Sequence, residues 1–396
     1  MSDCTFTSRR FQLICAPLRA ILPKLIAPLK NERHCRKFGA KTHLLLSLYA
    51  QILHISSANL LLAELNDLGS PQSGRNLRQM VGFDFIDKET CQPVQLNQSS
   101  FSRANLSHPY TLWHDCFVAL LPYVRNHCRP HYLAALGPLL AIDGSLFDCL
   151  GRMLWASYTH SSHKVRGHFL FDLAGLPTKL VLTTGKGSER TVLRQNLQAG
   201  VTYLMDRGYN DYALFRQIEA ASSHFVTRLL VNAAFEVVQS WQVTPAQRNL
   251  GVVTDQLIRF SHSAEVSCVR RVEWVDVLGN TFSYISSRQD IEPYLIVQLY
   301  KNRWLIERFF AWTGQHLQLK HWYSENENGV LIQLYAALIM FLLLKLFSAV
   351  SGLREFRTMN IEFVNWVQRH LFDGVLEWQI EAYLHTLGFA HSVLIA

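Results

Sequence analysis

The chain has 396 residues, of which 49% are hydrophobic and 17% are charged. This composition excludes a disordered or fibrous protein, and the length is sufficient for two or three domains. Lysine and arginine number 38 against 30 acidic residues, a formal net charge of +8, which favours nucleic acid, and next an anionic membrane, as a partner.

Two hydrophobic regions bear on where the protein acts. The first 30 residues contain scattered cations and prolines instead of the pattern of a secretory signal. The most apolar stretch, 331–350, contains Gln333 and Lys345, and its uninterrupted apolar run is too short to span a bilayer. We therefore expect a buried core helix at this stretch, a cytoplasmic protein, and no membrane partner.

Leucines recur at helical spacing between residues 13 and 132. This pattern predicts an all-helical N-terminal domain, residues 1–135. Within it, residues 99–106 could form a short helix that presents Arg103 and Asn105 to a DNA groove. A surface helix of an ordinary bundle is the favoured alternative.

The pattern changes near residue 136 to that of an α/β domain. An apolar run, 139–142, ends in Asp143, and a second one, 201–205, ends in Asp206. Strands at 169–173 and 180–184 and a helix capped by Ser188 are expected between them. Each aspartate alone could simply open a turn, but together they predict acids gathered at one sheet edge.

The remainder of the chain divides into three further regions. Residues 224–289 are rich in β-formers, with a hairpin turn expected at 278–280. A helix capped by Asp290 or Ser287 should follow, then the apolar helix and an amphipathic tail. The expected domains after residue 135 are therefore 136–223 and 290–350 as two parts of one core, 224–289 as an insertion, and 351–396 as a helical tail.

One helix face combines three groups that suit phosphate chemistry. Tyr300, Arg303 and Glu307 are spaced i, i+3 and i+7, which places them on one face of a continuous helix. Arginine can grip a phosphate in a fork, and carboxylates are the oxygen ligands that Mg²⁺ prefers. Glu307 could instead form only an ordinary pair with Arg303. Trp304 and Trp312 are expected to be core aromatics.

Three ordered motifs resemble a known family. Asp143-Gly144-Ser145, Asp206-Arg207-Gly208-Tyr209 and Y-x2-R-x3-E at 300–307 are similar to the DDE transposases of bacterial insertion sequences, with insertion-sequence family four as the closest branch. The resemblance implies an α/β fold with a ribonuclease-H-like catalytic core and a β-rich insertion, preceded by an all-helical domain and followed by a helical tail. It also implies metal-dependent cleavage at transposon ends and strand transfer.

The resemblance further implies the site and its partners. Asp143, Asp206 and Glu307 would be the catalytic residues and would hold two Mg²⁺ ions, with Mn²⁺ as a possible substitute. The substrate would be double-stranded DNA, both the terminal inverted repeats and the target, bound by a homodimer associated with the nucleoid. The expected DNA-binding residues are Tyr300 and Arg303, beside the transposon-end backbone or a flipped base, together with Arg207, Lys164, Arg166 and Arg228.

One position departs from the family pattern. Gly314 stands where the family has a lysine that could reach a DNA phosphate. This difference leaves open a degenerate copy that binds DNA without cutting it. A third alternative is another metal-dependent phosphoester hydrolase, such as a phosphatase that uses Asp143 as its nucleophile.

Overall fold

The computed structural model describes residues 11–29, 38–68, 74–128, 132–261, 266, 268–316, 321–350, 367 and 383–387. The chain forms two compact units. The first comprises residues 1–129, 148–155 and 311–396, and the second comprises 130–147 and 156–310. Apart from residues 367 and 383–387, the helical tail predicted for 351–396 lies outside the described residues.

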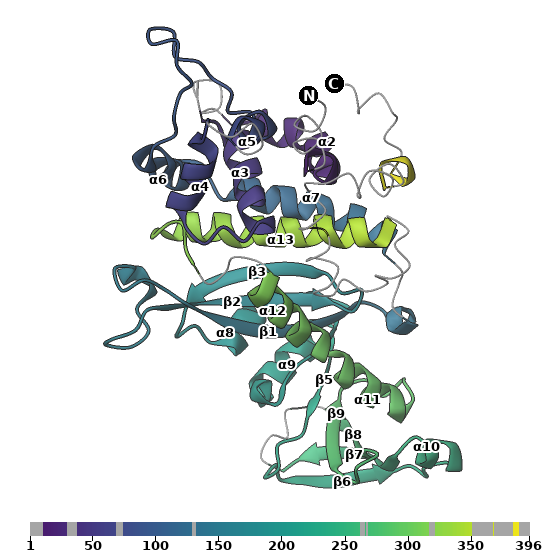
Figure 1. Cartoon of the computed structure of the whole chain (residues 1–396). Coiled ribbons are helices and arrows are strands. Elements are labelled where there is room, and N and C mark those ends of the chain that lie inside the picture. Colours follow the sequence, from purple (N-terminus) through teal and green to yellow (C-terminus); the bar gives the residue numbers. More distant parts are fainter. Residues whose placement is uncertain are drawn as a thin grey trace. The chain divides into compact units, whose positions relative to one another are not determined.

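The first unit is helical, as the leucine spacing predicts. Its α-helices are α2 (Ala16–Ile26), α3 (Ala40–Ile52), α4 (Ala58–Asn66), α5 (Gly74–Val81), α6 (Gln98–Ser107), α7 (Thr111–His127) and α13 (Glu327–Val350). The long α13 packs against α7 and α3 (Figure 1). Helices that bury an apolar stripe in this way gain most of their stability from packing rather than from intrinsic propensity.

Helix α13 is apolar on all sides because neighbouring helices surround it. Among the described residues it is the one helix whose length and composition would allow it to cross a membrane. Within the structure, however, 89% of its most apolar window is buried. A helix that is hydrophobic all round is expected at the centre of a large helical unit, so the prediction of a buried core helix is confirmed.

The second unit is built on one sheet. In the part of the chain that the structure describes, nine strands are hydrogen-bonded in the order β3-β2-β1-β4-β5-β9-β8-β7-β6. The strands are β1 (Leu139–Asp148), β2 (Lys164–Asp172), β3 (Pro177–Thr184), β4 (Thr202–Leu204), β5 (His224–Arg228), β6 (Phe235–Ser240), β7 (Val252–Phe260), β8 (Val269–Val275) and β9 (Thr281–Ser286). The α-helices are α8 (Glu189–Gln195), α9 (Tyr212–Ala220), α10 (Pro245–Asn249), α11 (Pro293–Asn302) and α12 (Trp304–His316), with α12 continuing into the first unit. Short 3-10 helices are η2 (Tyr132–Leu136), η3 (Leu154–Ala156) and η4 (Arg207–Tyr209).

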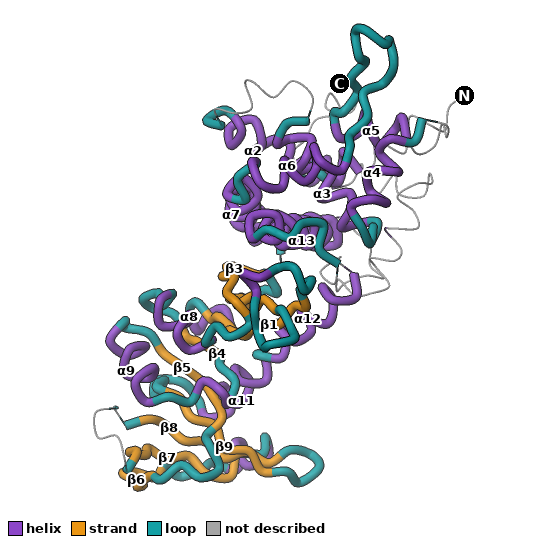
Figure 2. The backbone as a smooth tube through the Cα atoms, turned by 90° about the vertical axis from the view of Figure 1, so that its left-hand side faces the viewer, coloured by secondary structure: helices purple, strands orange, loops and turns teal. Residues whose placement is uncertain are grey.

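Strand β5 joins the two halves of this sheet. It pairs in parallel with β4 on one side and antiparallel with β9 on the other. The predicted β-rich region 224–289 is therefore continuous with the core sheet, and Figure 2 shows β5 running from the core toward β8 and β9. The antiparallel strands β6 to β9 follow as a meander from β5 outward.

Local sequence signals set several of the turns and helix ends. Ser188 caps α8 by accepting a hydrogen bond from the Thr191 amide, as predicted. Gly175 and Gly279 both have a φ of +82°, which glycine adopts without the steric cost of a Cβ atom. Gly279 lies at the predicted hairpin turn between β8 and β9, and Gly175 lies at the turn between β2 and β3.

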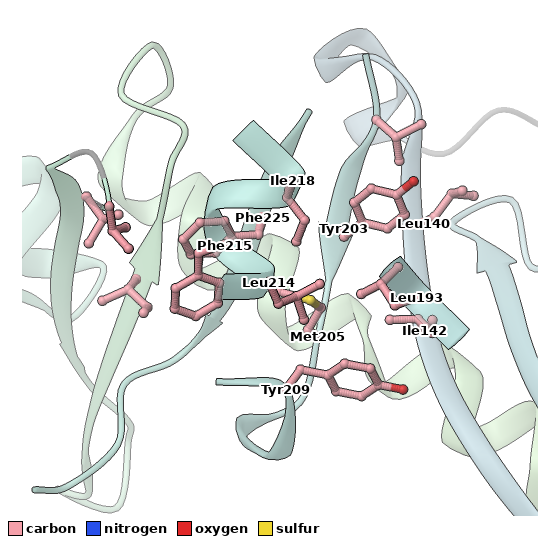
Figure 3. Packing of buried hydrophobic residues seen from close by; sticks show 14 of the residues in the cluster. Leu140, Ile142, Leu193, Tyr203, Met205, Tyr209, Leu214, Phe215, Ile218 and Phe225 are labelled. Carbon is pink, nitrogen blue, oxygen red and sulfur yellow. The ribbon is translucent and has the colours of Figure 1, made fainter. Parts of the chain in front are cut away.

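The two faces of the sheet are covered by different helices. Leu140 and Ile142 of β1 join a buried cluster with residues of α8 and α9, and Figure 3 shows Leu193 of α8 beside Ile142. Because side chains alternate along a strand, Ala141 and Asp143 point to the opposite face. That opposite face is the one against which α12 packs, through aromatic contacts to β2.

The helix predicted to run from residue 290 through Glu307 is interrupted. Helix α11 begins at Pro293, with Glu292 instead of Asp290 or Ser287 as its cap, and ends at Asn302. The amide of Arg303 bonds to the carbonyl of Tyr300 only three residues back, and the Asn302 side chain occupies the carbonyl of Gln298. The prediction of one continuous helix is therefore wrong, because a side-chain hydrogen bond competes with the helical ladder at this point.

Candidate active site

The two candidate aspartates lie on neighbouring parallel strands. Ala141 of β1 is in register with Leu204 of β4, so Asp143 and Asp206 each follow this pair by two residues. Adjacent strands are separated by about 4.8 Å, which places the two carboxylates side by side. Strand β1 continues to Asp148 beside β2, so the prediction that Asp143 terminates a strand is wrong, whereas Asp206 does follow the end of β4.

Hydrogen bonds hold the turn that carries Asp206. Its Oδ1 accepts from the Gly208 amide at 2.8 Å, and this bond caps the 3-10 helix η4. The hydroxyl of Thr227 donates to the Asp206 carbonyl at 2.9 Å, and Arg190 donates to the Gly208 carbonyl at 2.9 Å. The position of the carboxylate is thus set by contacts to β5 and α8 as well as by its own strand.

Arg303 lies between Asp143 and Glu307. Its guanidinium donates to Glu307 Oε1 at 2.5 Å, and its Nη1 atom is 3.9 Å from Asp143 Oδ2. The Arg303 side chain is largely buried, while that of Glu307 is 42% exposed. Packing of Phe309 against Phe169 and Phe171 fixes the helix that carries Glu307 over this face of the sheet. The structure therefore brings Asp143, Asp206 and Glu307 to one region, with Arg303 as a bridging cation.

Sequence reasoning missed a fourth acidic residue of this region. Glu189, the first residue of α8, forms an ion pair with Arg166. Its carboxylate lies against Gly144, where an added Cβ atom would come within 2.6 Å of Glu189 Oε1. The signal that could have revealed it was its place directly after the helix cap Ser188, but the pattern gave no reason to connect α8 with Asp143.

The carboxylates influence one another electrostatically. Burial raises the pKa of Asp143 to about 6; the Gly144 amide opposes this shift, while the negative charges of Glu189 and Asp206 add to it. Burial also raises the pKa of the Tyr209 hydroxyl well above its usual value, and Glu189, Asp143 and Asp206 contribute in the same direction. This is an accumulation of negative charge that a bound cation would relieve.

The donor set fits a hard divalent cation in its chemistry. Carboxylate oxygens are the preferred ligands of Mg²⁺, and Asp143, Asp206 and Glu307 supply them from one face of the sheet. Across the described ranges, no three histidine, cysteine, aspartate or glutamate side chains converge closely enough to hold a metal ion. The guanidinium of Arg303 lies between two of the candidate carboxylates, because it forms ion pairs with both Asp143 and Glu307.

Several of the predicted DNA-binding residues lie around a cavity beside this region. Tyr300, Arg303 and Arg228 line a cavity of about 1330 Å³ between α11, the start of α12 and the strands of the β-rich region. Its other aromatic lining residues are Trp274, Phe282, Tyr284, Tyr294 and Trp304. The Lys301 ammonium lies 3.6 Å from the centre of the Trp274 ring.

The other predicted DNA-binding residues have different surroundings. Arg207 is exposed on η4, next to Asp206. Lys164 is half-buried at the start of β2, with its ammonium 5.9 Å from the centre of the Tyr158 ring. Arg166 forms an ion pair with Glu189. The carboxylate of Glu189 therefore neutralises part of the positive charge that Arg166 would offer to a DNA phosphate.

Two smaller expectations are corrected by the structure. Trp304, expected in the core, is 59% exposed and lines the cavity. Asn105, considered for a DNA groove, is only 2% exposed, and its amide donates to the Phe101 carbonyl within α6. Arg103 on the same helix is exposed. The side chain of Trp312 lies outside the described residues.

Comparison with known proteins is consistent with the order of these motifs. The transposase DDE domain family model matches residues 135–343, which include all three candidate acids. The Sinorhizobium fredii protein y4zB, named as a transposase, is 26% identical over 331 residues, covering 77% of this chain and 90% of the relative. The Geobacillus stearothermophilus protein named as a probable transposase for insertion sequence element IS5377 is 24% identical over 294 residues. This match covers 72% of this chain and 76% of the relative.

A solved structure also resembles the chain. The piggyBac transposase in a synaptic complex with hairpin DNA aligns with a TM-score of 0.44 and 11% identity, covering 97% of this chain and 84% of that one. The family match alone extends over more than half of the chain, including both the β1–β4 pair and the Arg303–Glu307 helix. The chain therefore belongs to the transposases with a DDE domain, enzymes that cut DNA and transfer its strands.

Proposed function

We propose that this transposase cuts DNA at the terminal inverted repeats of an insertion sequence and joins the ends to target DNA. The observation that carries this proposal is the register of β1 and β4, which places Asp143 and Asp206 side by side under the helix of Glu307. In this proposal the parallel strands β1, β4 and β5 with α8 and α9 form a ribonuclease-H-like core. Strands β6 to β9 form its insertion, as in insertion-sequence family four.

Asp143, Asp206 and Glu307 would hold two Mg²⁺ ions, for which Mn²⁺ could substitute. When bound, these ions would lower the pKa of the attacking oxygen and stabilise charge on the leaving oxygen. The water oxygen would form a bond to phosphorus as the bond from phosphorus to the 3′-oxygen breaks, which frees a 3′-hydroxyl. That hydroxyl would then attack a phosphodiester of the target and release another 3′-oxygen, so no further reactant is needed.

The remaining residues of the site would position the DNA. Arg303, between Asp143 and Glu307, could donate to the phosphate next to the reacting bond. Tyr300 and Trp304 border the aromatic cavity, which has room for an unpaired base and is lined with cations. Arg207, Lys164, Arg166 and Arg228 would add salt-dependent contacts to the backbone. Synapsis of two DNA ends would require a homodimer, acting in the cytoplasm at the nucleoid.

The test uses DNA that carries the inverted repeats flanking the gene. Purified protein is incubated with this DNA, with and without Mg²⁺, and the products are resolved on a denaturing gel. Nicks at the repeat ends that need Mg²⁺ and vanish in a Glu307→Gln variant support the proposal. Hydrolysis of a small phosphate ester, with DNA left intact, would instead favour a phosphatase that uses Asp143.

Gly314 motivates a second candidate function, a copy that binds DNA without cutting it. Position 314 lies within α12, seven residues after Glu307, and holds glycine where the family pattern has a lysine. In this case the unaltered chain would retard the repeat DNA on a native gel without cutting it, and a Gly314→Lys variant would restore cleavage.

A further inference from the structure

We propose that Glu189 is a positioning residue of the proposed active site, whose carboxylate joins the backbone beside Asp143 to the turn that carries Asp206. The inference rests on the proposed roles of these two aspartates and deepens them. It is carried by contacts that the first turn of α8 makes with the residues just after each aspartate.

The first contact is with the residue that follows Asp143. Gly144 lies on the same face of β1 as Ile142, which packs against α8, whereas Asp143 points to the opposite face. A Cβ atom added to Gly144 would lie 2.6 Å from Glu189 Oε1 and 3.2 Å from its Cγ, well inside van der Waals contact. The Glu189 side chain therefore fills the space directly behind the candidate aspartate.

The second contact is with the turn that carries Asp206. Tyr209 belongs to η4, which Asp206 caps, and its side chain is fully buried. Figure 3 shows the Tyr209 ring extending from η4 toward β1. Its hydroxyl donates a hydrogen bond to the Glu189 carboxylate, and the next residue of α8, Arg190, donates to the Gly208 carbonyl at 2.9 Å. The start of α8 thus holds this turn at two points.

Arg166 of β2 keeps the Glu189 carboxylate in place. Its Nη1 atom donates to Glu189 Oε1, and both side chains are mostly buried. A buried carboxylate needs such partners, because a buried charge without them carries a large desolvation cost. Bonded to Arg166 and Tyr209, the Glu189 side chain connects β2 and β1 to the η4 turn.

These contacts bear on the separation of the two aspartates. Strand pairing fixes Asp143 within β1, but β4 ends at Leu204, so Asp206 lies in a turn whose position depends on side contacts. Displacement of a reacting group by about 1 Å can cost roughly a hundredfold in rate. A residue that holds this turn against β1 would therefore affect the rate of cleavage from the opposite face of the sheet.

The test separates positioning from a purely structural role in the full-length protein. Tyr209→Phe removes only the hydroxyl that bonds to Glu189, and Glu189→Gln removes the charge but keeps the size of the side chain. Tyr203→Phe is the matched control, because Tyr203 is also fully buried and its hydroxyl accepts a hydrogen bond from the Gln198 amide at 2.7 Å. Each variant is assayed for single-turnover cleavage of the repeat DNA, for affinity for that DNA without metal, for hydrogen exchange and for thermal unfolding.

We expect Tyr209→Phe to slow cleavage by roughly ten- to a hundredfold. Its affinity for DNA should stay unchanged, because Tyr209 packs in the cluster on the α8 face of the sheet. Tyr203→Phe should lower the melting temperature about as much as Tyr209→Phe but cut at the unaltered rate. Amides of η4 should exchange with solvent faster in Tyr209→Phe and in Glu189→Gln than in Tyr203→Phe.

A double variant, Tyr209→Phe with Glu189→Gln, tests whether the two side chains act through one hydrogen bond. Its cleavage should be no slower than that of the slower single variant, because the second change then removes nothing further. Losses that multiply would overturn the inference. If Glu189→Gln does not fold, Tyr209→Phe, which loses one oxygen atom, and its control Tyr203→Phe decide the question.

An Asp143→Asn variant distinguishes failure of this inference from failure of the proposed active site. If Asp143→Asn abolishes cleavage but Tyr209→Phe cuts at the unaltered rate, the positioning role is refuted and the proposed site stands. If Asp143→Asn cuts DNA normally, the proposed site itself fails. If the unaltered chain binds DNA without cutting it, hydrogen exchange decides, and equal exchange of the η4 amides in Tyr209→Phe and the unaltered chain refutes the inference.

Discussion

The buried ion pair between Arg270 and Asp255 connects the β-rich region to the segment just before α11, the helix that carries Tyr300. Removing one charge of this pair tests how strongly the pair stabilises that part of the protein. Arg270 of β8 donates two hydrogen bonds to Asp255 of β7, at 2.7 and 2.6 Å. Its third nitrogen donates to the carbonyls of Gln289 and Ile291, just before the helix that carries Tyr300. The two side chains are only 10% and 5% exposed. Arg270 thus ties the sheet to the start of α11.

Replacing Asp255 by asparagine keeps the shape but leaves the guanidinium charge buried and unpaired. Breaking a buried pair on one side costs about 3–5 kcal/mol, which corresponds to a roughly hundred- to several-thousand-fold change in an equilibrium constant. A double variant, Asp255→Leu with Arg270→Met, removes both charges. It should cost less than Asp255→Asn alone, because only the carbonyls of Gln289 and Ile291 then lose a donor.

Native-state hydrogen exchange is the assay, because it reports the free energy of opening strand by strand. Amides of β7 and β8 should exchange roughly a hundred to several thousand times faster in the Asp255→Asn variant than in the unaltered protein. Amides of β2 and β3 serve as the internal control for local opening. Acceleration of less than fivefold in β7 and β8, or a double variant that is more destabilised than the single one, would refute this account of the pair.

Three further predictions concern other parts of the chain. Burial and the neighbouring His108 lower the pKa of His43 below its usual 6.5, so the unfolded state binds more protons below that pH. The free energy of unfolding should therefore fall as pH drops below 6.5, by at most about 1.4 kcal/mol per pH unit from this group, in urea titrations at several pH values; a His43→Gln variant should show a smaller slope. Trp304→Ala should weaken binding of repeat DNA by about 1–3 kcal/mol if the ring stacks on a base, measured by fluorescence anisotropy, and equal affinity would exclude that contact. Ser188→Ala should remove the cap of α8 and cost about 1 kcal/mol, measured by thermal unfolding, with no change meaning that water replaces the cap.

Local signals in the sequence were sufficient for much of the fold. The leucine spacing predicted the helical first unit, and runs of apolar and β-forming residues next to turn signals predicted β2, β3, β8 and β9. These elements follow from short-range preferences, such as the cap at Ser188 and the positive φ at Gly279. The order of Asp143, Asp206 and Glu307 was likewise visible, and with it the resemblance to the transposase family.

Only the tertiary structure decided how these residues meet. The interruption at Arg303 depends on a competing side-chain bond from Asn302, which spacing alone does not show. Trp304 is exposed beside the cavity, although the sequence favoured a place in the core. Glu189 reaches Gly144 because α8 packs across β1, a contact between distant parts of the chain. Helical and strand periodicities determine which face a side chain occupies within its own element, whereas the partner of that face is set by packing between elements.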